Sequence, residues 1–185
     1  MDQVAYYRYS FTDPPALDIT TAPLPSPVVT LSATNASSLF RSSNLAAVIK
    51  KLTSRFGASD LFIQLALYPG ELVAVIAGKG GVAWPVSVTD AGAMTVGPRA
   101  GFDGTRSGID FSQFVPGVIE QLTDLIVTKG GVPLSAIARF VLTNSLPDQN
   151  SGWNIYLTSG TTRFQALVLG EDPVKITPDG THPVS

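Results

Sequence analysis

Residues 44–56, NLAAVIKKLTSRF, predict an amphipathic helix and decide the fold. The apolar residues of this stretch recur at helical spacing and form one stripe: Leu45, Val48, Ile49, Leu52 and Phe56. Asn44 precedes the stripe as an expected N-cap, and Gly57 follows it as an expected C-terminal stop. A helix of this kind cannot bury its apolar stripe alone, so we expect it to pack on a sheet.

The same motif returns later in the chain. Residues 48–53, VIKKLT, match residues 118–123, VIEQLT, at an offset of 70 positions (118 − 48). Further along, Trp84, Val86 and Val88 match Phe164, Ala166 and Val168 at an offset of 80 (164 − 84). The added length falls in the expected loops 129–135 and 146–151, where insertions are tolerated. We interpret this pattern as an internal duplication, the alternative being two unrelated units of similar layout.

Strand-like runs follow each helix, the second of which begins near Pro116. After the first helix they span residues 61–68, 71–77, 81–88 and 94–96, and after the second 136–143, 153–158, 161–169 and 174–177. We therefore expect an α+β fold of two tandem α-β-β-β(-β) units, each with one helix packed on its own antiparallel sheet. Strict alternation predicts these residues on the helix side: Leu61, Ile63, Leu65, Leu67, Ala136, Ala138, Phe140 and Leu142.

The N-terminal region differs in composition from the rest. Residues 4–11 predict an aromatic-rich strand, and the prolines of residues 12–35 predict an extended connector, with a short strand at residues 28–31. The expected organisation is residues 1–38 for the strand and connector, 39–108 for the first unit, 109–178 for the second, and 179–185 for a flexible tail.

In its order of elements, residues 40–178 resemble the tandem helix-on-sheet units of the beta-lactamase-inhibitor-protein and PepSY type. Those units are extracytoplasmic modules that bind or restrain other proteins. The resemblance concerns topology, so it implies a binding role and carries over no functional residue.

Composition narrows the class of protein. The 185 residues include 12 Lys and Arg, 14 Asp and Glu and no Cys, which gives a net charge of −2. This balance argues against nucleic acid as a partner, and no run approaches the roughly 20 apolar residues of a transmembrane helix. Residues 1–3 lack the pattern of a signal peptide, yet low charge with abundant Ser, Thr, Gly and Pro favours an exported bacterial domain. A cytoplasmic protein is the alternative.

The sequence offers few groups for catalysis or metal binding. Its one histidine, His182, lies in the expected tail, so a serine nucleophile lacks a nearby base. Without cysteine or clustered histidine we expect no metal site and no cofactor, and the acids at Asp103, Glu171 and Asp172 read as turn residues. We expect a protein that is not an enzyme, the alternative being one that uses dispersed carboxylates.

These expectations lead to a binding module of the cell envelope, which recognises a protein or an envelope component through the sheet face that carries no helix. The residues expected to contact the partner are Tyr68, Arg139, Trp153 and Tyr156. One alternative is a carrier of a lipid or other hydrophobic ligand, with an apolar cavity of ~300–1,000 Å³. A virion structural protein is the second alternative.

Overall fold

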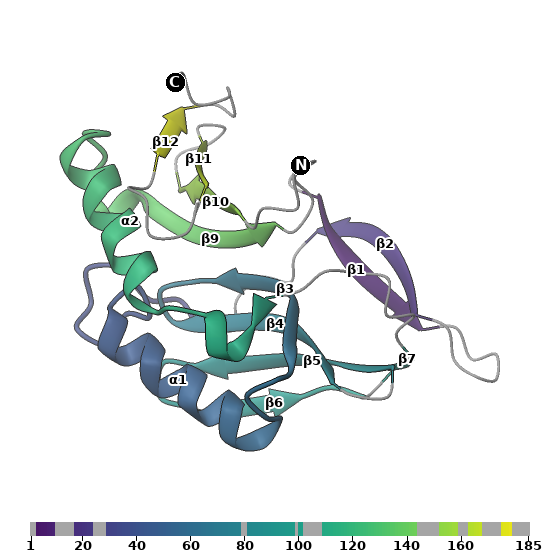
Figure 1. Cartoon of the computed structure of the whole chain (residues 1–185). Helices are drawn as coiled ribbons and strands as arrows, with labels where there is room; N and C mark the ends of the chain where they lie inside the picture. Colours follow the sequence, from purple (N-terminus) through teal and green to yellow (C-terminus); the bar gives the residue numbers. More distant parts are fainter. Residues whose placement is uncertain are drawn as a thin grey trace.

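The computed structural model describes residues 3–9, 17–23, 29–78, 81–98, 100–101, 109–143, 152–158, 163–167 and 175–178. Outside residues 29–158 the description covers the backbone alone. Two helices and an antiparallel sheet make this an α+β protein, as predicted (Figure 1). The expected tail, with His182, and the acids Asp103, Glu171 and Asp172 lie outside the described residues.

The elements follow the sequence pattern closely. The helices are α1 (Ser42–Arg55) and α2 (Gly117–Thr128), with short 3₁₀ turns at Phe111–Gln113 and Leu134–Ala136. The strands are β1 (Gln3–Tyr9), β2 (Leu17–Pro23), β3 (Leu61–Leu67), β4 (Glu71–Gly78), β5 (Val82–Thr89), β6 (Met94–Val96), β7 (Ala100–Gly101), β8 (Ile109–Asp110), β9 (Ile137–Thr143), β10 (Gly152–Leu157), β11 (Arg163–Leu167) and β12 (Lys175–Pro178).

The N-terminal region departs from the prediction. Strand β2 lies within the segment expected to be an extended connector, and it pairs with β1 in a separate two-stranded antiparallel sheet. No strand forms at residues 29–31, the described part of the short strand expected there. Backbone hydrogen bonds to β1 satisfy the peptide groups of β2. The side-chain pattern of a Pro-rich stretch does not reveal such backbone pairing.

The first helix begins earlier than expected. Asn44 is not its N-cap, because its side-chain amide donates instead to the carbonyls of Ala36 and Ser38, at 2.9 and 3.0 Å. The helix starts at Ser42 after Arg41, whose backbone is extended. At the other end Gly57 has φ +130°, which confirms the predicted stop, since this conformation favours glycine.

One sheet joins the strands of both halves, whereas we expected two sheets. Its order is β12-β11-β10-β9-β3-β4-β5-β6, with β7 beside β5 and β8 beside β3. The halves meet where β3 pairs with β9, over the three residue pairs Leu65–Leu142, Ala66–Val141 and Leu67–Phe140. The first part of the same edge of β3 pairs with β8. The buried residues of α1 and α2 pack against the same face of the sheet and form one core with it. We call the opposite face of the sheet the helix-free face.

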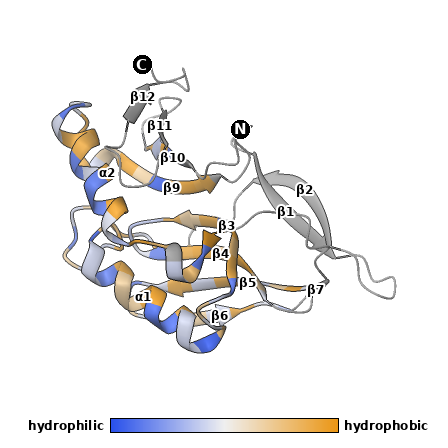
Figure 2. Ribbon diagram, viewed as in Figure 1, coloured by the Kyte–Doolittle hydropathy of each residue, from blue (hydrophilic) through white to orange (hydrophobic). Residues whose placement is uncertain are grey.

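Hydropathy agrees with this layering. In Figure 2 the central strands are mostly hydrophobic, while α1 and α2 alternate between hydrophobic and hydrophilic residues. The core contains a chain of aromatic contacts that crosses from one half to the other. Its members are Phe40, Phe140, Trp153, Phe114, Phe62 and Phe111.

Two β-bulges alter the predicted facing of the central strands. Phe62 pairs with Ile76 and Gln64 with Val75, which leaves Ile63 as the extra residue of β3. Phe62 therefore turns into the core, and Ile63 packs on the helix-free face, so the predicted inward position of Ile63 is wrong.

The second bulge lies at the start of β9. Tyr156 pairs with Arg139 and Leu157 with Ile137, so Ala138 is the extra residue. Ile137 is the buried core residue here, in place of the predicted Ala136 and Ala138. The inward positions of Phe140 and Leu142 are confirmed.

The turn between β3 and β4 is closely packed at Gly70. A Cβ added at Gly70 would lie 2.7 Å from Cγ1 of Val29 and 2.9 Å from Cβ of Leu31. Gly70→Ala should therefore lower the free energy of unfolding by about 1–3 kcal/mol, measured by urea denaturation.

Gly117 provides the matched control, because an added Cβ meets nothing within 4 Å there. Gly117→Ala should raise the stability by about 0.4–1 kcal/mol, since alanine reduces the entropy of the unfolded chain. Equal effects of the two substitutions would contradict the close approach of Val29 and Leu31.

Candidate functional site

A row of polar and aromatic side chains crosses the helix-free face. Strand β10 contributes Tyr156, which pairs with Arg139 of β9. Tyr68 follows β3 one step beyond the Leu67–Phe140 pair, and its N–H donates to the carbonyl of Glu71 on β4 at 2.8 Å. We call Tyr156, Arg139, Tyr68 and Glu71 the tyrosine–arginine row.

Arg139 is the centre of the row. Its guanidinium carbon lies 4.4 Å from the centroid of the Tyr156 ring, a cation–π geometry. The guanidinium also hydrogen bonds to the Tyr68 side chain. Arg139 and Tyr156 are half-buried, so the stacked pair is accessible in part and held in place. A pre-ordered Arg and Tyr lose little side-chain entropy when a partner binds.

Tyr68 is more buried than its neighbours, with 6% of its surface exposed. Burial raises the pKa of the Tyr68 hydroxyl above its usual value of 10.0, because the ionised form loses hydration. The positive charge of Arg139 opposes this increase, and the negative charge of Glu71 adds to it. The Tyr68 hydroxyl is therefore neutral at physiological pH, and its hydrogen bond helps to hold the Arg139 guanidinium in place.

Glu71 was not identified from the sequence, where it is the first residue of the expected strand 71–77. Only 2% of its surface is exposed. Its carboxylate accepts from the N–H of Val29, with an N···O distance of 3.4 Å. A carboxylate is buried only where polar partners compensate for lost hydration, and that depends on contacts far apart in the sequence.

Trp153 does not belong to the row. It lies in the core with 5% of its surface exposed, and its ring centroid is 6.0 Å from that of Phe114 and 6.4 Å from that of Phe140. The expectation that Trp153 shares a face with Tyr156 is wrong, since residues three apart on a strand point to opposite faces.

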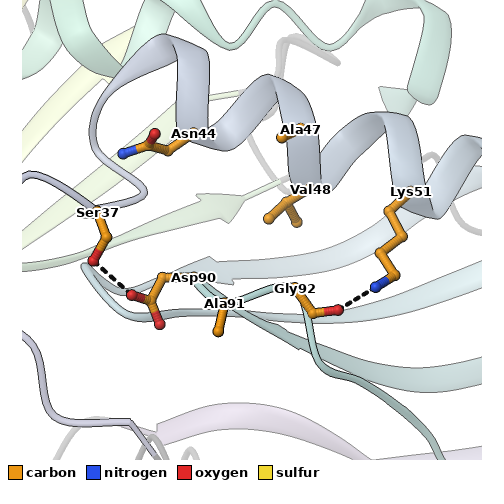
Figure 3. A pocket seen from close by; sticks show the side chains of 8 residues that line it. All are labelled: Ser37, Asn44, Ala47, Val48, Lys51, Asp90, Ala91 and Gly92. Atoms are coloured by element: carbon orange, nitrogen blue, oxygen red, sulfur yellow. Dashed lines mark hydrogen bonds between the residues drawn. The ribbon is translucent and has the colours of Figure 1, made fainter.

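A separate pocket of about 290 Å³ lies between α1 and the turn after β5 (Figure 3). Ser37 donates from Oγ to the Asp90 carboxylate at 2.6 Å, and Lys51 donates to the carbonyl of Gly92. These contacts tie α1 and the segment before it to the turn, while the aromatic contact of Phe56 with Trp84 at 5.6 Å ties the end of α1 to β5 itself. The polar groups on the rim bind one another, which favours a structural role for the pocket.

Within the described ranges, no three His, Cys, Asp or Glu residues come together as a metal site. Neither α1 nor α2, the helices of those ranges, is long and apolar enough to cross a bilayer. No family model matches the chain, and searches of curated proteins and of solved structures found no match to it. The function is therefore argued from the geometry of the described residues.

Proposed function

We propose that this protein is a non-catalytic binding module of the bacterial cell envelope, which recognises a protein or an envelope component through the helix-free face. The observation that carries the proposal is the stacked pair Arg139 and Tyr156, supported by Tyr68. Arg and Tyr are enriched among residues that dominate binding energy at interfaces. Since Trp153 lies in the core, the proposed contact residues are Arg139 and Tyr156, with Tyr68 as their support.

The organisation of the chain as two tandem units is part of the same proposal. Sheet order runs outward from the centre as β3-β4-β5-β6 in one direction and β9-β10-β11-β12 in the other. Each half supplies one helix, and Ile49 and Ile119, which match in sequence, are both buried in the core. Such an arrangement is what a duplicated helix-on-sheet unit would give.

The two central strands support the duplication further. Each has its bulge directly after its first core residue, at Ile63 in β3 and at Ala138 in β9. The core residues around the bulges correspond at an offset of 75 positions (137 − 62), namely Phe62, Leu65 and Leu67 with Ile137, Phe140 and Leu142. This offset of 75 lies between the offset of 70 for the helices and the offset of 80 for the later strands. A stepwise increase is expected if the second half has longer loops. The proposed class is a tandem module similar to the beta-lactamase-inhibitor-protein and PepSY type.

Photo-crosslinking in cells tests the proposed surface. A photo-reactive phenylalanine derivative at position 156 should form an adduct with the partner, because Tyr156 is half-exposed on the helix-free face. The same derivative at Gln121, an exposed residue of α2, serves as the control position. We expect an adduct at 156 that is absent at 121.

The second variant tests the stacked pair. Arg139→Lys keeps the charge but removes the planar guanidinium that stacks on the aromatic ring at position 156, so adduct formation there should fall at least about tenfold. Near-UV circular dichroism should show that Arg139→Lys remains folded. Equal adducts at 156 and 121, or an adduct unaffected by Arg139→Lys, would contradict the proposed binding surface.

A further inference from the structure

The first turn of α1 lacks a cap of its own. Four N–H groups at the start of any helix have no partner within the helix. Arg41 occupies the N-cap position with φ −87° and ψ 131°, but its side chain accepts no hydrogen bond, and no acidic residue lies in the first turn. The predicted cap, Asn44, binds the preceding loop instead.

The missing cap comes from the other helix. The N–H of Ser42 donates to Oε2 of Glu120 on α2, with an N···O distance of 3.1 Å. The side chain of Ser42 also hydrogen bonds to Glu120, and the positive charge of Arg41 acts on the same carboxylate. A carboxylate at this position satisfies a free N–H and interacts favourably with the helix dipole.

This contact joins the helices of the two halves directly. Their strands pair over three residue pairs between β3 and β9 and over two between β3 and β8. We propose that Glu120 is the N-cap of α1 in trans, and that this cap couples the helix of the second half to the helix of the first. Lys50, the residue of α1 that matches Glu120 in the repeated motif, has no acceptor and so cannot supply a corresponding cap to α2.

The cap depends on the charge of Glu120. Its hydrogen bonds with Ser42 hold the pKa of the Glu120 carboxyl below its usual value of 4.5, and Arg41 contributes to the decrease. The stabilisation is therefore complete above about pH 4.5 and is lost as the pH falls through the lower pKa of the folded state. Arg41 faces Glu120 from α1, and Asp124 lies one turn further along α2 itself.

Solution NMR of the full chain tests the proposal. The amide resonance of Ser42 should shift between pH 6 and 3 with the titration of Glu120, because the carboxylate is its hydrogen-bond acceptor. This shift should be absent in Glu120→Gln and present in Asp124→Asn, the matched control at an exposed position of the same helix. Glutamine would keep an acceptor oxygen, so the cap itself is removed with Glu120→Ala, in which hydrogen-exchange protection at the start of α1 should fall about five- to tenfold.

A cap supplied within α1 gives a second test. Arg41→Ser places a hydroxyl at an extended N-cap position, so Glu120→Ala combined with Arg41→Ser should regain the lost protection. A Ser42 amide that titrates identically in Glu120→Gln, or protection unchanged by Glu120→Ala, would overturn the proposal. Recovery by Arg41→Ser would show that the lost protection came from capping rather than from a general loosening of α2.

Discussion

Replacing Trp153 by alanine is expected to lower the free energy of unfolding by about 3–5 kcal/mol. The side chain is buried in the core, and its ring contacts those of Phe114 and Phe140. Removing it leaves a large cavity between Phe114 and Phe140, and the neighbouring strands can close that cavity only in part. Urea denaturation at 25 °C, followed by far-UV circular dichroism, measures the change.

Tyr156→Ala is the matched control for Trp153→Ala, since both residues lie on β10 and point to opposite faces. Tyr156 is half-buried, so its loss should remove the stacking on Arg139 and lower the stability by only about 1 kcal/mol. If both substitutions destabilise the protein equally, Trp153 and Tyr156 are not separated into core and surface, and the proposed contact residues would have to be revised.

The second large effect is expected at Phe62. Its side chain is fully buried, with its ring centroid 4.3 Å from that of Phe111 and 5.5 Å from that of Phe114. Phe62→Ala should lower the free energy of unfolding by about 3–5 kcal/mol. The rings of Phe111 and Phe114, which both precede α2, would lose their contact with the first half of the sheet.

The neighbour Leu61 tests the bulge that places Phe62 in the core. Strict alternation along β3 predicts Leu61 and Ile63 in the core, whereas the structure leaves Leu61 partly exposed and buries Phe62. Leu61→Ala should therefore cost clearly less than Phe62→Ala, about 1–2 kcal/mol, because less apolar area is lost. The reverse order of the two effects would show that β3 alternates without a bulge.

The predictions for Trp153 and Phe62 also help to interpret the binding experiment. Substitutions in the aromatic chain remove binding only by unfolding the protein, whereas substitutions in the tyrosine–arginine row should affect binding while the fold persists. This distinction between loss of folding and loss of binding matters most for Trp153. The sequence alone does not distinguish an aromatic residue on an exposed sheet face from one in the core.

Much of the fold was predictable because it depends on local spacing. The stripes of residues 44–56 and 118–126 predicted both helices, and alternating apolar runs between Gly and Pro turns predicted the strands of residues 61–96 and β9 and β10. Within the candidate site, Arg139, Tyr156 and Tyr68 were identified from residue type and strand position. Hydrophobic periodicity of 3.6 or 2 residues is a property of neighbours in the chain, so the sequence carries it directly.

The tertiary structure decided how these elements combine. A bulge at Ile63 exchanged the faces expected for Phe62 and Ile63, and pairing between β3 and β9 merged two expected sheets into one. Burial of Glu71 and the capping of α1 by Glu120 depend on partners 42 and 78 residues away. Local spacing thus determined which segments become helices and strands. Long-range pairing determined which polar groups are satisfied and which faces meet, because a buried hydrogen bond forms only after distant segments have packed together.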